Sequence, residues 1–455
     1  MAEMNKVPSA NKDAEVRKIT GEVEIDPLTA SDVEKEVKNI PDFKEKIERS
    51  LKKRVTDLLE IILAGSFFLD ASDIHIEPEE EKVKFRLRID GVLQDVLYFE
   101  SKKYKALLSR IKLLSELKLN VHDRPQDGRF SILIEGTSVE IRTSCIPAEY
   151  GESLVLRVLN PKWVVSMEKL GLRKDLLEIF KREIKEPNGM IICTGPTGSG
   201  KTTTLYAFLQ KINTPEIKII TIEDPIEYHL EGISQTQVEE AKGYDFANGL
   251  RAIVRQDPDV ILVGEVRDLE TAQIALQASL TGHLVLSTVH TNDAAGTIVR
   301  LQALGEKPVN IAPALNMAIG QRLVRKVCEK CIQLKKILPE DFKKIKRNLK
   351  NLSKNIEIPK IEPEIKIPYV KGCRDCNFTG YKGRIGIFET FIVDNQMERF
   401  ILSSPSIVDM REKAIKKGMV LMRQDGFLKV LQGVTTIEEI ERVTKEEEAT
   451  GKTFE

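Results

Sequence analysis

The spacing of apolar and polar residues changes several times in the first third of the chain. From Leu51 the apolar positions recur every three or four residues, which predicts a helix, and from Ser72 they alternate strictly, which predicts a strand. Residues 83–89 alternate between apolar and basic side chains up to Asp90-Gly91, a hairpin turn sequence. A helix over 107–119, a turn at 125–128 and strands at 139–142 and 154–159 complete a small α+β domain that we expect to close near Asn160.

From Met190 short apolar runs alternate with helical patterns, which predicts an α/β domain with a parallel sheet covered by helices. Its strands are expected at 190–194, 218–222, 260–263 and 284–288. We interpret the remaining segments from their composition. The predicted order is a charged, mobile or partly helical arm (1–50), the small domain (51–160), a helical connector (161–188), the α/β core (189–325), a cysteine module with a long exposed proline-containing excursion (326–385) and a polar helical region (386–455).

Composition and charge narrow the class of protein. The chain has 455 residues, 41% of them hydrophobic, enough for two or three domains with their own cores. Its 70 basic residues balance its 70 acidic ones, which argues against nucleic acid as the main partner. The longest apolar stretch, near 58–69, is shorter than the roughly 20 residues that span a bilayer, and no export signal is visible. We therefore expect a cytoplasmic protein that reaches a membrane only through partners.

A glycine-rich segment carries the clearest chemistry. It matches GxxxxGK[ST], follows a predicted strand and opens a predicted helix. Glycines let backbone N–H groups surround phosphate, Lys201 neutralises β and γ oxygens, and Thr202 ligates Mg²⁺. The absence of an NKxD guanine motif favours ATP, so Mg-ATP is the expected ligand. The loop residues are Gly195, Pro196, Thr197, Gly198, Ser199, Gly200, Lys201, Thr202 and, just beyond, Thr203.

Carboxylates and histidines follow other predicted strands. Glu265 comes after 260–263, where many P-loop enzymes place an acidic Mg²⁺ residue and then a catalytic Glu; here Gly264 replaces the first. Glu265 is therefore expected to orient water or to hold Mg²⁺ through water. Because carboxyl ends of parallel strands share one edge, Glu223 and His290 should converge with Lys201 on the γ-phosphate. For His290 a γ-phosphate contact outweighs an ordinary polar role, and for His283 the two are balanced.

Four arginines are weaker candidates, because most arginines are merely solvated. Arg251 and Arg255 lie one helical turn apart, and Arg142 and Arg157 lie on strands of the first domain. They gain a role if nucleotide binds between domains or subunits, where an arginine from a neighbour stabilises phosphoryl charge. His75 and Glu77, two apart on one strand, lack a third metal ligand, and a solvated strand face explains them better.

Six cysteines include two CxxC pairs. Cys328 and Cys331 form the first pair and Cys373 and Cys376 the second, which together supply the four thiolates of a structural Zn²⁺ site. The 41 residues between the pairs exceed the usual spacing. Without an export signal, metal binding is favoured over disulfides, with four free thiols as the alternative.

Eight further stretches carry a family resemblance over roughly residues 55–440. They are SDIHIEP, FRLRIDGVL, RPQDGR and YGESLVLRVL in the first domain, then TGPTGSGKTTTLY, TIEDPIEY, LRAIVRQDPDVILVGEVRD and TGHLVLSTVHTNDA. Together they resemble the ATPases of type II secretion and type IV pilus assembly. The resemblance implies a RecA-like domain after a PAS-like domain, in a homo-hexamer that drives a platform protein at the cytoplasmic face of the inner membrane.

The same resemblance implies roles for individual residues. Glu223 and Glu227 would belong to an acidic box, Glu265 to an atypical second nucleotide motif, and His283 and His290 to a histidine box. The four arginines named above would reach nucleotide within or between subunits. The cysteine module resembles that of assembly ATPases, which retraction ATPases lack, so assembly is favoured over retraction.

Two departures and two rival functions complete the interpretation. Only about 50 residues, many of them charged, precede the recognisable part, where many assembly ATPases carry a docking domain. The insertion at 334–370 has no assigned role. A nucleic-acid translocase on a similar core would need a basic channel, which the neutral charge opposes. A scaffold that binds nucleotide without hydrolysis is opposed by the filled catalytic positions other than Gly264.

Overall fold

The computed structural model describes residues 21–163, 165–350, 352 and 356–444. The chain divides into two compact units, Met1–Asn160 and Pro161–Glu455, and this boundary coincides with the expected end of the first domain. None of the described helices is long and apolar enough to cross a membrane.

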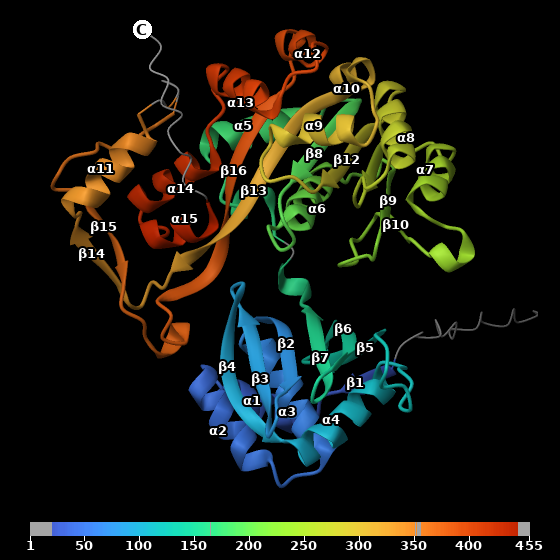
Figure 1. The fold of residues 1–455 in the computed structure, drawn as a ribbon, viewed down its shortest axis with the longest axis vertical. Coiled ribbons are helices and arrows are strands. Elements are labelled where there is room, and N and C mark those ends of the chain that lie inside the picture. Colours follow the sequence, from blue (N-terminus) through green and yellow to red (C-terminus); the bar gives the residue numbers. More distant parts are fainter. Residues whose placement is uncertain (1–20, 164, 351, 353–355, 445–455) are drawn as a thin grey trace, which may run out of the picture. The chain divides into compact units, whose positions relative to one another are not determined.

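The first unit is a seven-stranded sheet with the strand order β1-β5-β6-β7-β2-β3-β4. β1 runs parallel to β5 and the other neighbours are antiparallel. The helices of this unit pack against the sheet (Figure 1). Alternate strand residues are buried with the helices in one hydrophobic core, and the intervening polar residues of β3 are mostly half-buried. The elements are β1 (Gly21–Glu24), α1 (Pro27–Glu36), α2 (Ile40–Ser50), α3 (Val55–Phe68), β2 (Ala71–Pro78), β3 (Lys82–Ile89), β4 (Val92–Glu100), α4 (Ser101–Leu114), β5 (Gln126–Ile134), β6 (Thr137–Ala148) and β7 (Gly151–Leu159).

The predicted charged arm is wrong for residues 21–50, which are folded into the first unit. Phe43 and Ile47 on α2 are fully buried, and the Phe43 ring packs edge-on against Phe85 at 6.0 Å between centroids. Sparse apolar residues at helical spacing were enough to bury one face of each helix, although charged residues dominate the composition. Residues 1–20 lie outside the described part of the chain.

The second unit is built on another seven-stranded sheet, in the order β10-β9-β11-β12-β8-β13-β16. All neighbours are parallel except β13 and β16. Separate hydrophobic cores cover its two faces, which confirms the expected α/β class. The elements are α5 (Lys174–Glu183), β8 (Gly189–Thr194), α6 (Lys201–Ile212), β9 (Ile219–Glu223), β10 (Ser234–Gln237), α7 (Phe246–Val254), β11 (Val260–Val263), α8 (Leu269–Leu280), β12 (Leu284–Val289), α9 (Gly296–Ala303), α10 (Pro308–Ala314), β13 (Leu315–Val327), β16 (Tyr381–Ile392), α12 (Asn395–Ile401), α13 (Ile407–Lys416), α14 (Met422–Leu431) and α15 (Ile437–Val443).

The cysteine module lies between β13 and β16, and it differs from the exposed excursion that we expected. β14 (Ile332–Lys336) pairs antiparallel with β15 (Lys366–Val370), and α11 (Pro339–Asn348) lies between them in sequence. Ile345 and Ile367 are buried in a core that includes Phe427 on α14. The predicted limits at 325 and 386 also cut through β13 and β16, because both strands continue the central sheet.

Candidate active site

The glycine-rich loop joins β8 to α6, as its spacing predicted. Gly195, Gly198 and Gly200 have φ angles of +152°, +77° and +87°, a region that side chains other than glycine rarely occupy. Gly200 caps α6 without any side-chain hydrogen bond, so the first N–H groups of the helix are open to an external acceptor. A helix N-terminus of this kind binds phosphate.

Inside the loop, the Ser199 hydroxyl is buried and has no hydrogen-bond partner among the described residues, as expected of a group that binds phosphate. Ser199 is 3% exposed, and its Oγ makes no hydrogen bond with any residue that the structure describes. A Cβ at Gly195 would lie 2.6 Å from both the Ser199 Oγ and the Gln321 carbonyl oxygen, so only glycine fits. The loop tip is exposed at Pro196, Thr197 and Gly198, and Thr202 and Thr203 are half-buried on the first turn of α6.

Lys201 reaches back over the loop that it terminates. Its Nζ donates to the carbonyl oxygens of Gly195 at 2.8 Å and Pro196 at 3.3 Å. Burial lowers the pKa of the Lys201 ammonium, and the nearby Arg322 guanidinium lowers it further while Glu265 opposes the change. The loop therefore holds a partly desolvated cation that a phosphate anion would stabilise.

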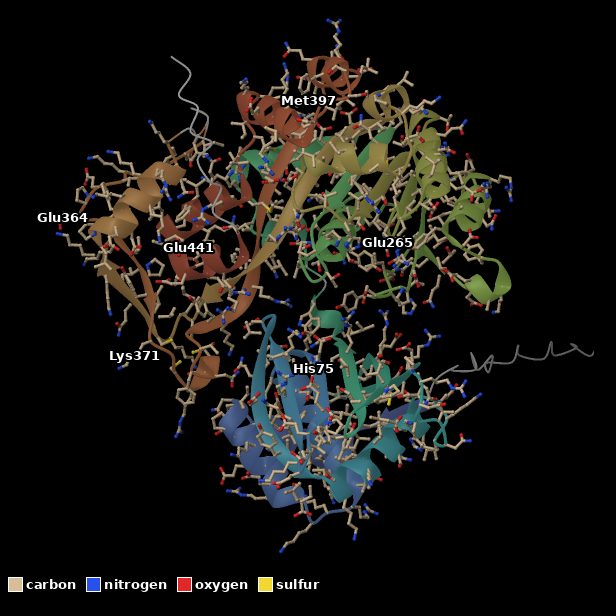
Figure 2. The ribbon with its side chains drawn as sticks, in the orientation of Figure 1. His75, Glu265, Glu364, Lys371, Met397 and Glu441 are labelled. Carbon is tan, nitrogen blue, oxygen red and sulfur yellow. The ribbon has the colours of Figure 1, made fainter. Side chains whose placement is uncertain are left out.

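Glu265 and His290 meet where β11 and β12 end, as the sequence predicted. The Glu265 Oε2 lies 3.3 Å from the His290 Nε2, and a second oxygen of Glu265 accepts a hydrogen bond from Arg267. Arg267 also lies 3.6 Å from Asp224, after β9. Figure 2 shows Glu265 at this edge of the sheet. A carboxylate oriented by an imidazole and a guanidinium can hold a water molecule by accepting its hydrogen bond.

Position 264 leaves little room for a side chain. A Cβ at Gly264 would lie 3.3 Å from the Glu223 Cα and the Ile222 carbonyl oxygen, both on the neighbouring strand. The Gly264 carbonyl accepts a hydrogen bond from the Thr288 Oγ1 at 2.8 Å. Strands β9, β11 and β12 therefore lie close together at this edge of the sheet.

Glu223 does not point to the same place as Glu265. Its side chain is buried and accepts hydrogen bonds from the Tyr206 hydroxyl, from the Thr221 Oγ1 at 2.6 Å and from the Gln235 Nε2 at 3.2 Å. Burial raises the pKa of the Glu223 carboxyl, against these hydrogen bonds. Glu227, half-buried in the following segment, raises that pKa further. In the structure Glu223 therefore braces β9 against α6.

His283 lies at the opposite end of β12 from His290. Its Nδ1 is 3.0 Å from the Ala278 carbonyl oxygen, at the end of α8. The six residues of β12 separate the two histidines by roughly 20 Å at the rise of an extended strand. The structure therefore does not bring His283 to the glycine loop.

Arg251 on α7 and Arg255 just after it lie at the surface of the second unit. Arg251 forms an ion pair with Glu270 of α8, and the Arg255 Nη1 donates to the Arg251 carbonyl at 3.0 Å. The Arg251 side chain is 44% exposed. Both residues are exposed.

Arg142 and Arg157 belong to the first unit and face one another on paired strands. The Arg142 Nε donates to Glu140 at 3.2 Å and the Arg157 Nε donates to Asp73 at 3.2 Å. Both lie on the polar face of the sheet, together with His75. Their part in nucleotide chemistry stays a prediction.

Sequence reasoning missed two residues of β13 beside the loop. The Gln321 side chain accepts from the Thr204 Oγ1 at 2.8 Å, and the Arg322 Nη2 donates to the Asn292 carbonyl at 2.7 Å. No motif marks these positions. A longer apolar strand pattern at 315–327 was the only available signal.

The four cysteines of the two CxxC motifs come together in the module. Cys328 and Cys331, before β14, face Cys373 and Cys376, and all four sulfur atoms lie within 4.8 Å of one another. Three Sγ–Sγ distances are 3.8–3.9 Å, close to the edge of about 3.8 Å for a tetrahedron with Zn–S bonds of 2.3 Å. The Gly380 N–H donates to the Cys376 Sγ at 3.2 Å. The donor set fits structural zinc.

A parallel sheet, a glycine loop opening a helix and a Glu-His pair on neighbouring strand ends define a P-loop nucleoside triphosphatase. The chain belongs to the family described as type II/IV secretion system protein, whose model matches residues 47–442.

Individual relatives agree with this assignment. The chain is 44% identical over 408 residues to type II secretion system ATPase E of Vibrio cholerae, covering 90% of this chain and 78% of that protein. It is 43% identical over 383 residues to the type IV pilus assembly ATPase PilB of Thermus thermophilus, covering 83% of this chain and 42% of that one.

Solved structures of related ATPases share the fold of this chain. The pilus retraction motor PilT with bound ADP superposes with a TM-score of 0.56 at 27% identity, covering 85% of this chain and 96% of that chain. DotB of Legionella pneumophila, at 22% identity and a TM-score of 0.60, shares the fold. The chain is an ATP-hydrolysing enzyme of the secretion and pilus-assembly class, which confirms the resemblance seen in the sequence.

Proposed function

We propose that the chain is a hexameric motor that powers assembly of a type IV pilus or a secretion pseudopilus through a platform protein, at the cytoplasmic face of the inner membrane. The sustained identity to ATPase E and PilB supports this proposal. The observation that carries the catalytic part is the 3.3 Å contact between Glu265 and His290. The cysteine cluster favours assembly over retraction.

In the proposed reaction, the glycine loop and the N-terminus of α6 bind the phosphates of Mg-ATP. Lys201 neutralises charge on the β and γ oxygens, and Thr202 ligates Mg²⁺. Glu265 accepts a hydrogen bond from the attacking water, and His290 and Arg267 keep its carboxylate in place. Water then attacks the γ-phosphorus and the bond to the β-phosphate oxygen breaks, giving ADP and inorganic phosphate.

Arginines outside this edge would link hydrolysis to movement. In our proposal Arg142, Arg157, Arg251 and Arg255 approach the phosphates across a domain or subunit boundary, where their charge stabilises the transition state. Arg157, Arg251 and Arg255 are exposed, and the Arg142 side chain is 18% exposed. Hydrolysis removes the anion that they bind, so it changes which closed arrangement is populated.

Four cysteines would hold zinc in this motor. When bound, the ion supplies a rigid four-way crosslink between the segment after β13 and the segment before β16. The thiolates have no part in hydrolysis in our proposal. Their role is to fix the shape of the module.

The test is steady-state ATP hydrolysis by the wild type and by Glu265→Gln, with and without single-stranded DNA, alongside the mass in solution. Glu364→Gln, an exposed carboxylate of the module (Figure 2), is the matched control. We expect DNA-independent activity from a six-fold assembly, a fall of about 10²–10⁴-fold in Glu265→Gln and none in the control. Strong stimulation by DNA would instead indicate a translocase, and equal rates in wild type and Glu265→Gln would indicate a scaffold.

A further inference from the structure

Arg322 on β13 lies between two parts of the proposed nucleotide site. β13 is the parallel neighbour of β8, and Gly320 pairs with Thr194 at the start of the loop. The Arg322 Nη1 lies 3.2 Å from the position of a Cβ on Gly195. Its Nη2 donates to the carbonyl of Asn292, two residues beyond His290. One guanidinium therefore touches both the glycine loop and the segment that carries His290.

Arg322 forms no ion pair in the part of the chain that the structure describes. Burial lowers the pKa of its guanidinium, and the more distant Glu389 and Asp293 carboxylates only partly oppose this. The Arg322 guanidinium is half-buried, and its hydrogen bonds go to the neutral carbonyls of Gln321 at 3.0 Å and Asn292 at 2.7 Å. Arg325, three residues further along the same strand, is instead bound by Glu439 at 2.8 Å. Among the described residues, Arg325 thus has a carboxylate in direct contact, whereas Arg322 has carboxylates only at a longer distance.

A second cation, Lys201, lies near Arg322, and two nearby cations destabilise the site unless an anion binds between them. Among the described residues, Lys201 also donates to backbone carbonyls alone, and Arg322 lowers the pKa of the Lys201 ammonium. Two partly desolvated cations that face the same loop repel each other and are stabilised by a shared anion. A phosphate chain is such an anion, and the planar guanidinium fork suits its oxygens.

The position of Arg322 also indicates which phosphate it would meet. Asn292 follows His290 closely, and His290 contacts Glu265, the residue proposed to hold the attacking water. This end of the loop is therefore the γ end. We propose that Arg322 is a nucleotide-binding residue supplied within the subunit, which donates hydrogen bonds to the γ-phosphate and so distinguishes ATP from ADP. The proposal rests on the proposed role of the glycine loop as the phosphate site.

The experiment compares nucleotide affinities, not only rates. Binding of a non-hydrolysable ATP analogue and of ADP is measured calorimetrically on the full chain for wild type, Arg322→Gln, Arg322→Lys and Lys201→Ala. Lys326→Gln removes an exposed charge from the same strand and is the control. We expect Arg322→Gln to weaken the ATP analogue by about 10-fold or more and ADP by less than about 2-fold, with Arg322→Lys between wild type and Arg322→Gln.

Other outcomes separate the alternatives. Equal weakening of both nucleotides, or unchanged binding of both, overturns the γ-phosphate assignment. If Arg322→Gln does not fold, which its melting temperature without nucleotide reveals, Arg322→Lys alone decides, because a selective loss for the ATP analogue still requires the guanidinium fork. Normal binding by Lys201→Ala would instead reject the loop as the phosphate site, a failure that the Arg322 variants do not mimic.

Discussion

The glycine loop and the cysteine cluster lie in the same unit but are built in opposite ways. The loop is made of backbone, with positive φ angles at three glycines and open N–H groups at the start of α6. It stands on β8, a strand whose residues are all buried. The cluster is made of side chains, and Cys331 and Cys373 are only half-buried.

This difference teaches where the stability of each site comes from. The hydrophobic cores on both faces of the central sheet hold the loop in shape. The hydrophobic core around the module contains no residue of 328–331 or 371–380, the segments that carry the cysteines, and a tetrahedral ion would supply the crosslink that packing does not. We therefore expect the two sites to fail under different treatments.

Metal removal should have the largest effect and should act on the module alone. Structural zinc sites contribute about 10–16 kcal/mol in small zinc domains, so a chelator or Cys376→Ser should unfold the segments around 328–331 and 371–380. Metal analysis and limited proteolysis measure this directly. Cys145→Ala, a buried thiol in the other unit, is the control and should keep the metal. ADP binding that disappears together with the metal would contradict the independence of the two sites.

The free energy of unfolding of the second unit should depend on pH through Glu389 of β16, which is hydrogen-bonded next to the glycine-loop edge. Its carboxyl accepts from the Ala294 N–H at 2.8 Å, just past His290, and from the Met422 N–H at 3.2 Å. Burial raises the pKa of Glu389 from 4.5 to about 7, with Asp293 adding to this. The folded state therefore keeps a proton that the unfolded state releases, and this stabilisation is lost as the pH rises through 7.

Denaturant unfolding of wild type and Glu389→Gln between pH 5 and pH 8 measures the effect. Wild type should lose about 2–3 kcal/mol relative to the variant over this range. Glu364→Gln removes an exposed carboxylate, which pairs with Lys336 at the surface, and should follow the wild type. Parallel curves for wild type and Glu389→Gln would show that Glu389 is ionised throughout.

Gly264→Ala should have a smaller effect, on the edge where β9 and β11 touch. The new methyl group would meet backbone atoms of Ile222 and Glu223 at 3.3 Å, and a buried strand cannot easily move away. We expect a loss of about 1–3 kcal/mol in the free energy of unfolding. A lower hydrolysis rate should accompany it, because Glu265 is the next residue. An unchanged urea midpoint would mean that the strands can separate at little cost.

Four strands of the second unit (β8, β9, β11 and β12) were predictable because each is mostly apolar and is bounded by loop residues. β11 was predicted at its observed bounds, and β8 began one residue earlier than expected. Glu265 and His290 followed from the rule that parallel strands share a carboxyl edge. Their contact needed no information beyond the strand order.

Other features depended on tertiary context that local patterns do not carry. Residues 125–128 read as a turn, but Gln126 pairs with Cys145 and opens β5. Glu223 sat at the correct strand end, yet the Tyr206 hydroxyl holds its carboxylate in the interior. Arg322 and Gln321 became visible only when β13 was placed beside β8, more than a hundred residues away in the chain.

The module is inserted into the connection between two antiparallel strands, and its two ends meet. Val327 near the end of β13 pairs directly with Tyr381 at the start of β16. An ordinary short turn could join these positions without changing the register of the sheet. The module is thus an insertion within a strand-to-strand connection, and a change in the length of its middle would leave the pairing of β13 with β16 in register.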